Sequence, residues 1–267
     1  MGEQKRYALV SGATGGMGRY ICKSLLERGM TLYLPCRSRE KEEELRHFLE
    51  RESPLYKRDL VVCVQADFES FASVLALCER VMEECGQIEL LMNNAAIIAP
   101  EFKLTPDGYE RSLQVNYLVP RYMTELLLPH ITRQVINTVS CSTKVVSFNR
   151  FCKEIAEAEI FDIVEGRFNY NAEEHRKHFG HLKDYSRSKL LLDDFTHRLR
   201  ERTMGGLYVD GADPGIVDTN IITQHRWYDS LADVFFRPLI LSPERILSST
   251  LLKSCHFSID LYFFRLI

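Results

Sequence analysis

Short apolar runs alternate with amphipathic stretches along most of this chain, and this alternation constrains the fold more than any other feature. We expect strands at the apolar runs, residues 7–10, 31–36, 60–65, 88–92, 135–139 and 207–210. We expect helices at the amphipathic stretches, residues 16–28, 40–52, 71–84, 109–128 and 186–202. Such alternation is typical of a parallel sheet covered by helices on both faces, whose strands are apolar throughout. The pattern therefore predicts an α/β fold with a doubly wound parallel sheet.

The length and composition fit one domain. The chain has 267 residues, of which 45% are hydrophobic, enough for a large core. There is no internal repeat, low-complexity linker or break in composition, so we predict a single domain over residues 1–267. Residues 147–183 are polar and rich in Glu, His and Asn, and they are interpreted as an insertion between a strand and the next helix.

Charge and targeting signals argue against several classes of protein. The net charge of −3 gives no general attraction to nucleic acid or to an anionic membrane. No apolar run approaches the ~20 residues of a membrane span, and the first residues lead directly into a strand without a signal-peptide pattern. The eight cysteines form no CxxC pair, which favours reduced thiols and a cytoplasmic protein.

No metal site is predicted from the sequence. His175, His178 and His181 follow each other at a spacing of three, but no fourth ligand is evident. A surface helix is the favoured interpretation of these three histidines.

A glycine-rich loop follows the first expected strand and opens the first expected helix. It reads Ser11-Gly12-Ala13-Thr14-Gly15-Gly16-Met17-Gly18. Glycines let the backbone turn tightly and approach a pyrophosphate, and the helix N-terminus supplies free N–H groups. Its position between strand and helix makes this loop a much stronger signal of dinucleotide binding than the glycines alone.

Further short segments then occur in a fixed order along the chain. They are Asn93-Asn94-Ala95-Ala96 after the fourth strand, Asn116 within a helix, Ser140 after the fifth strand, the Tyr185 and Lys189 pair, and Pro214-Gly215 with Thr219. With the spacing Gly12-x-x-x-Gly16-x-Gly18, this set resembles the short-chain dehydrogenase/reductase family over roughly residues 5–250. The resemblance implies a Rossmann-type fold and a nicotinamide-dependent oxidoreductase.

The resemblance also implies catalytic roles. A phenol has a pKa of ~10, and a lysine one helical turn away favours the phenolate. Tyr185 is therefore expected to exchange the proton with substrate, and Lys189 to lower the Tyr185 pKa and hold the nicotinamide ribose. Ser140 is expected to donate a hydrogen bond to the substrate oxygen, with Ser142 as a rival for that role. Asn116 is expected to hold a water that links Lys189 to solvent.

The end of the second strand favours NADP(H) over NAD(H). NAD enzymes usually carry an acidic residue there for the ribose hydroxyl, whereas this chain has Arg37, whose guanidinium can pair with a 2′-phosphate. Asp67 and Phe68 resemble the family pair beside the adenine, although Asp67 could also cap the helix that begins near Ser70. The expected cofactor contacts are Gly12, Thr14, Gly16, Met17, Gly18, Arg37, Asp67, Phe68, Asn94, Ala95, Tyr185, Lys189, Pro214, Gly215, Val217 and Thr219.

The substrate is expected to be a hydrophobic small-molecule carbonyl compound or alcohol. Phe236-Arg237-Pro238 and Ser242-Pro243-Glu244 resemble the retinol-dehydrogenase-like branch, and residues 227–241 are apolar, which also fits ordinary core packing. A non-catalytic NADP(H)-binding regulatory protein is the alternative, disfavoured because Ser140, Tyr185 and Lys189 are all present. A nucleotide-sugar epimerase or dehydratase is disfavoured by the chain length. A homodimer or homotetramer is expected from the resemblance.

Overall fold

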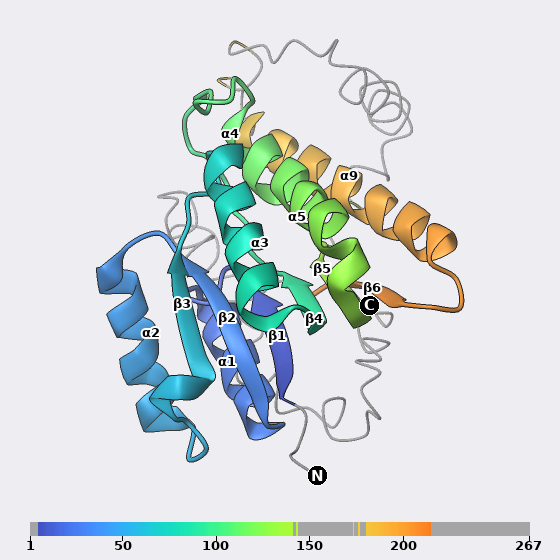
Figure 1. Cartoon of the computed structure of the whole chain (residues 1–267). Helices are drawn as coiled ribbons and strands as arrows, with labels where there is room; N and C mark the ends of the chain where they lie inside the picture. Colours follow the sequence, from blue (N-terminus) through green and yellow to red (C-terminus); the bar gives the residue numbers. More distant parts are fainter. Residues whose placement is uncertain (1–4, 141–142, 144–172, 174–175, 177–179, 215–267) are drawn as a thin grey trace.

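Six parallel strands form one sheet in the computed structural model, which describes residues 5–140, 143, 173, 176 and 180–214 (Figure 1). The strands are β1 (Arg6–Val10), β2 (Met30–Cys36), β3 (Val61–Gln65), β4 (Ile88–Asn93), β5 (Ile131–Thr138) and β6 (Tyr208–Ala212). Their order in the sheet is β3-β2-β1-β4-β5-β6. This is the strand order of the doubly wound Rossmann fold, which confirms the predicted fold class.

Helices cover both faces of the sheet. On one face lie α1 (Gly16–Glu27) and α2 (Arg39–Glu52), and on the other lie α3 (Phe71–Cys85), α5 (Val119–Leu127) and α9 (Gly180–Arg202) (Figure 1). A short helix, α4 (Arg111–Leu113), and a π-helical turn, η2 (Gln114–Leu118), lead into α5. Two 3₁₀ turns, η1 (Arg58–Leu60) and η3 (Leu128–His130), precede β3 and β5.

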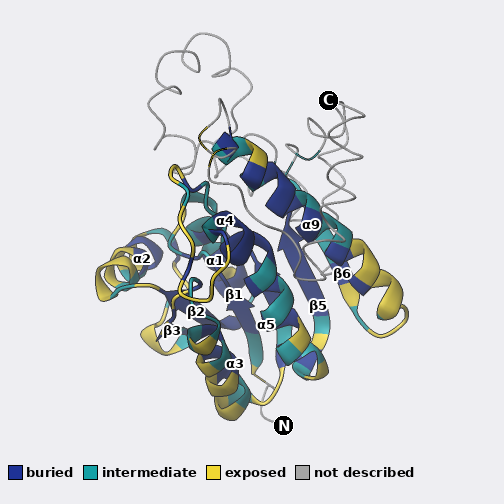
Figure 2. Cartoon of the chain, turned by 90° about the horizontal axis from the view of Figure 1, so that it is seen from above, coloured by how far each residue is buried: buried dark blue, intermediate teal, exposed yellow. Residues whose placement is uncertain are grey.

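The core consists of two apolar clusters, one on each face of the sheet. The strands and the inner sides of the helices are buried, while the outer sides of the helices are exposed (Figure 2). All seven residues of β2 are buried, as expected for a strand with neighbours on both edges and helices on both faces. The five described cysteines are free thiols. None of the described helices has both the length and the apolar character needed to cross a bilayer.

Several element boundaries differ from the sequence-based expectation, three of them at β5, at α9 and at the helix that leads into α5. β5 begins at Ile131 instead of residue 135, α9 begins at Gly180 instead of residue 186, and the expected helix 109–128 begins at Arg111 and contains the π-helical turn. The earlier start of α9 assigns residues 180–183 of the expected insertion to a helix. Tyr185 and Lys189 therefore both lie within regular helix.

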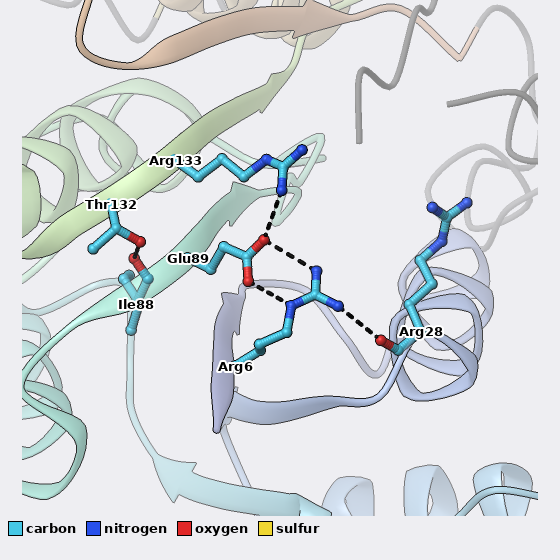
Figure 3. A network of polar contacts seen from close by, with 6 residues as sticks. All are labelled: Arg6, Arg28, Ile88, Glu89, Thr132 and Arg133. Carbon is cyan, nitrogen blue, oxygen red and sulfur yellow. Dashed lines mark hydrogen bonds and ion pairs between the residues drawn. The ribbon is translucent and has the colours of Figure 1, made fainter. Parts of the chain in front are cut away.

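An ionic network ties three strands together at the amino end of the sheet (Figure 3). Arg6 donates two hydrogen bonds to Glu89, at 2.7 and 3.0 Å, and a third to the carbonyl of Arg28, where α1 ends. Arg133 on β5 donates to the same carboxylate at 3.2 Å. The hydrogen bonds from Arg6 and the two nearby guanidinium charges hold the pKa of Glu89 below its ordinary value. The network lies at the opposite end of the strands from the site described below.

Replacing Glu89 with Gln removes the charge that the two guanidinium groups share and is expected to lower the free energy of unfolding by about 1 kcal/mol at pH 7. The effect is no larger because solvent reaches part of the network and screens it. The side chain of Arg6 is 36% exposed. A carboxylate whose folded pKa is lowered stabilises the protein above its unfolded pKa, and this contribution is lost as the pH falls through the folded pKa. Urea unfolding should therefore give curves for Glu89→Gln and the parent that converge in acid.

Glu44→Gln serves as the matched control for this prediction. Glu44 also pairs with a cation, Lys41 at 2.7 Å, but its side chain is 61% exposed. Its replacement should change the stability by less than about 0.5 kcal/mol at any pH. Equal effects of the two substitutions would contradict the stabilising role of the network.

Candidate active site

The candidate site lies where β1, β4, β5 and β6 end. β1 and β4 are neighbours in the sheet, and the chain leaves them toward opposite sides, with β2 next to β1 and β5 next to β4. Ligands of doubly wound sheets bind at such a switch point, outside the carboxyl ends of the strands. The loops that follow these strands carry Gly12, Asn94, Ser140 and Pro214.

The glycine-rich loop is packed so tightly that two positions exclude any side chain. Gly12 has φ +66°, and a Cβ built on it would lie 2.7 Å from the Cα of Ala95. A Cβ on Gly18 would lie 2.0 Å from the carbonyl oxygen of Gly12. The first contact brings the loop against the end of β4, and the second brings α1 against the loop. Both glycines are therefore required by the backbone itself.

The N-terminus of α1 lies at the same edge of the sheet, where the strands end. Gly15 is its N-cap, no side chain caps the helix, and its first turn carries no acidic residue. The amide groups of this turn are thus available to an anion, and the helix dipole favours negative charge there. Thr14, Gly16 and Met17 are half-buried at this turn, where the sequence places the cofactor phosphates.

Ser11 and Asn94 fix the loop to the end of β4. The Ser11 hydroxyl accepts hydrogen bonds from the amides of Asn94 and Ala95, both at 3.0 Å, and donates to the carbonyl of Met92. The Asn94 side chain donates to the carbonyls of Ser11 and Gly12 at 3.2 and 3.3 Å. Sequence analysis did not assign Ser11 a role; its position between the first strand and the first glycine was the available signal.

The adenosine end of the expected cofactor site lies after β2 and β3. Arg37 follows β2 directly and is exposed, and no described residue forms a hydrogen bond or ion pair with its guanidinium. The cap of α3 is Ser70, whose side chain accepts from the Ser73 amide, so Asp67 is not the helix cap. The Asp67 carboxylate instead accepts from the Glu69 amide at 3.0 Å, while Phe68 is buried.

Lys189 is the most deeply buried charged group of the site. Its side chain lies on α9 and is 1% exposed, and Nζ donates a 2.7 Å hydrogen bond to the carbonyl of Thr138 at the end of β5. Burial lowers the pKa of Lys189 to about 7, against an opposing effect of the Asp213 carboxylate. The ammonium lies 5.9 Å from the ring centroid of Tyr185, one helical turn earlier.

Ser140 leaves β5 two residues after Thr138, which places it at the same edge of the sheet. Its carbonyl accepts hydrogen bonds from the amide and the hydroxyl of Thr143, at 3.1 and 2.9 Å. Ser142, the rival for the serine role, lies outside the described residues, as do Gly215, Val217 and Thr219. Pro214 is the last described residue after β6.

Asn116 lies in the π-helical turn and is fully buried. Its side-chain oxygen accepts from the amide of Ile97 at 2.8 Å, and its side-chain nitrogen donates to the Ile97 carbonyl at 2.8 Å and to the Ser188 hydroxyl at 3.0 Å. The amide thus joins the loop after β4 to α9. The expected water held by Asn116 stays a prediction, and the observed contacts of the side chain are with protein groups.

A row of buried polar side chains links β4 and β5 to the two helices α5 and α9 on one face of the sheet. Asn93 donates to Thr124 on α5 at 3.0 Å and to Asn137 on β5 at 2.8 Å, and Asn137 donates to Thr196 on α9 at 2.8 Å. All four residues are at most 1% exposed. This row fixes two helices against β4 and β5. One is α5, which begins shortly after Asn116, and the other is α9, which carries Lys189. This row was not predicted from the sequence, because Asn137 and the threonines give no separate signal.

Comparison with known proteins identifies the family of this chain. A model of the short chain dehydrogenase family matches residues 6–152, more than half of the chain. The chain belongs to the short-chain dehydrogenase/reductase family. Within the described ranges, no three His, Cys, Asp or Glu side chains lie close enough to hold a metal ion.

Several curated relatives that match over 80% or more of this chain are named retinol dehydrogenases. Human retinol dehydrogenase 14 is 30% identical over 225 residues, which cover 80% of this chain and 62% of the relative. Bovine retinol dehydrogenase 12 is 26% identical and is aligned over 88% of this chain and 68% of the relative. The chain thus spans less than two thirds of the length of retinol dehydrogenase 14.

Solved structures of the same family share the fold. A short-chain dehydrogenase from Burkholderia cenocepacia J2315 in complex with NADP has a TM-score of 0.66 at 21% identity, covering 93% of this chain and 90% of that chain. A short-chain dehydrogenase from Sphingobium yanoikuyae in complex with NADPH has a TM-score of 0.65 at 20% identity, covering 92% and 83%. These similarities confirm the fold class.

The buried ammonium of Lys189 predicts a pH dependence of stability. Because the folded pKa lies below the value in the unfolded chain, the unfolded protein binds more protons between about pH 7 and pH 10, so stability rises with pH across this window. Relative to Lys189→Met, the cofactor-free parent should gain up to about 1.4 kcal/mol per pH unit in urea unfolding.

Lys183→Met is the control for the Lys189 measurement. Lys183 lies on the same helix and is exposed, so its removal should leave the slope of stability against pH unchanged. Parallel pH profiles of the parent and Lys189→Met would show that the ammonium is not buried as described.

Proposed function

We propose that this chain is an NADP(H)-dependent oxidoreductase that transfers a hydride between nicotinamide and the carbonyl or alcohol carbon of a hydrophobic small molecule. The observation that carries the proposal is the buried ammonium of Lys189, one helical turn from the Tyr185 phenol and held at the end of β5. A buried cation beside a phenol serves proton transfer to oxygen, which is the part of the reaction that the protein has to supply.

The residues present fit a dinucleotide. The cradle at Gly12 and Gly18 admits no side chain of its own, and the uncapped amides of α1 suit a pyrophosphate. Asn94, Ala95, Tyr185 and Lys189 would hold the nicotinamide half at the ends of β4 and β5. A bound nicotinamide would donate or accept the hydride; the residues of the chain would orient the substrate and move its proton.

Three side chains would share the work at the substrate oxygen. Tyr185 would donate its phenolic proton to the oxygen during reduction and take it back during alcohol oxidation. Lys189 would favour the phenolate, since an adjacent positive charge stabilises the negative form. The Ser140 hydroxyl would donate a hydrogen bond to the oxygen as negative charge develops there.

Arg37 supports NADP(H) as the preferred cofactor. It stands where NAD enzymes carry a carboxylate, it is exposed, and the described part of the chain offers its guanidinium no internal partner. A 2′-phosphate would supply that partner through charge-assisted hydrogen bonds. The solved relatives include complexes with NADP, NADPH and NAD, so Arg37 is the feature of this chain on which the choice rests.

The relatives named retinol dehydrogenases support a hydrophobic alcohol or its carbonyl counterpart as the substrate. The apolar segment 227–241, to which the sequence points for substrate contacts, lies outside the described residues.

The outer sides of α5 and α9 carry ion pairs such as Arg202 with Glu125 at 2.8 Å. The homodimer or homotetramer and the cytoplasmic location stay predictions.

Tyr185→Phe is expected to lower kcat by about 10³-fold, because a positioned acid or base contributes about 10²–10⁴-fold. NADPH consumption should be measured against a panel of hydrophobic aldehydes and ketones, and NADPH binding by calorimetry. Binding should be retained, since the ring and the rest of the pocket stay. Tyr208→Phe removes the hydroxyl of a tyrosine that is 70% exposed on β6 and should leave kcat unchanged. Tight NADPH binding without turnover in the parent would favour the non-catalytic regulatory protein.

Arg37→Asp is expected to raise the dissociation constant of NADPH by about 10–100-fold, the loss of about 1.5–3 kcal/mol from charged hydrogen bonds. The dissociation constant of NADH should fall or stay the same, because a carboxylate suits the ribose hydroxyls. Arg39→Asp is the control, since Arg39 is also exposed but is the first residue of α2. If both variants bind the two coenzymes as the parent does, the assignment of Arg37 is wrong.

A further inference from the structure

Ser188 is a buried serine in the helical turn between Tyr185 and Lys189. It is 0% exposed, and its hydroxyl donates a 2.7 Å hydrogen bond to the carbonyl of Tyr185. The same hydroxyl accepts a 3.0 Å hydrogen bond from the side-chain nitrogen of Asn116. Both hydrogen bonds have the lengths of well-formed interactions in a site closed to water.

These contacts connect two parts of the candidate active site. The Asn116 side chain accepts a hydrogen bond from the amide of Ile97, in the loop that follows β4, and donates one to the carbonyl of Ile97. Its nitrogen also donates to the Ser188 hydroxyl. Ser188 in turn holds the backbone of Tyr185. A continuous series of hydrogen bonds thus runs from the loop after β4 to the first residue of the Tyr185 and Lys189 pair.

The carbonyl that Ser188 contacts is important for the geometry of that pair. In an α-helix the carbonyl of Tyr185 accepts the amide four residues ahead, which is that of Lys189. A serine that bonds back to the same carbonyl gives it a second donor, and such back-bonding commonly bends a helix slightly. The turn that separates the phenol from the ammonium, 5.9 Å from ring centroid to Nζ, is therefore shaped by the Ser188 hydroxyl.

We propose that Ser188 is a positioning residue for proton transfer: by joining the Asn116 amide to the Tyr185 carbonyl, it sets how closely the Lys189 ammonium approaches the phenol. Ser188 touches neither substrate nor cofactor in this role and acts through Tyr185. The inference rests on the proposed function, in which Tyr185 exchanges the proton. It assigns to Ser188 the placement of the phenol for proton transfer, because a small displacement of a reacting group from its productive position lowers the rate strongly.

The neighbouring serine supplies a matched control. Ser186 lies two residues earlier on α9 and is also buried. In the described structure its hydroxyl forms no hydrogen bond, whereas that of Ser188 forms two. Ser186→Ala and Ser188→Ala thus remove the same atom from buried positions of the same helix, and only the second removes a link to Tyr185.

The test measures kcat and KM by NADPH consumption and the dissociation constant of NADPH by calorimetry, all in the full chain. Ser188→Ala should lower kcat about tenfold with KM unchanged, and Ser186→Ala should leave both unchanged. With substrate, kcat/KM of Ser188→Ala should fall about tenfold at neutral pH while the dissociation constant of NADPH stays within about twofold.

Ser188→Cys provides a second variant of similar volume with a weaker donor. It should lower kcat less than Ser188→Ala does, and it replaces Ser188→Ala if that variant does not fold. A kcat that is the same in the parent, Ser186→Ala and the Ser188 variants would overturn the positioning role. Unchanged turnover in Tyr185→Phe would overturn the proposed function instead, and the two failures are distinguishable because they are read from different variants.

Discussion

The hydrogen bond between the buried ammonium of Lys189 and the carbonyl of Thr138 is the interaction around which the candidate site is organised. A cation without access to water is costly unless a polar group receives it. The end of β5 supplies that group, and α9 must pack against the sheet in one position for Nζ to reach it. The helix that carries Tyr185 is thereby docked against the sheet, and the burial of the ammonium that follows lowers the pKa of Lys189. The Nζ atom of Lys189 thus takes part both in the packing of α9 against the sheet and in the chemistry of the candidate site.

The glycine loop and the Asn116 amide differ from Lys189 in that they serve the geometry of the site and not its chemistry. Gly12 and Gly18 are needed because backbone atoms of Ala95 and of Gly12 itself occupy the space of a Cβ. Asn116 uses its amide to tie the loop after β4 to α9, and the π-helical turn around it has the kind of irregularity often found at functional positions. Neither feature contributes a reacting group. Both determine where reacting groups lie.

Much of this arrangement could be predicted from the sequence, and the exceptions have physical reasons. The apolar strands and the glycine loop were recognisable because each leaves a local pattern. The start of β5 was predicted late, since Thr132, Arg133 and Gln134 are polar and find partners in Ile88, Glu89 and Asp210, far away in sequence. The π-helical turn carries Asn116, whose side chain bonds to Ile97, 19 residues away, and such a contact leaves no local pattern in the sequence. Ser188 lies in the interior of a helix, where serine gives no signal of its own.

The row of buried amides beneath the site bears on how the strands align. Asn93 and Asn137 face each other directly in the pairing of β4 with β5, and each also reaches a threonine on a helix of the same face. Sliding one strand past the other by a single residue would turn the two amides to opposite faces of the sheet. The hydrogen bond between the two amides would then be lost in a buried place, at about 1–3 kcal/mol. The pair therefore discriminates against misaligned sheets, a task that the interchangeable aliphatic side chains around it perform poorly.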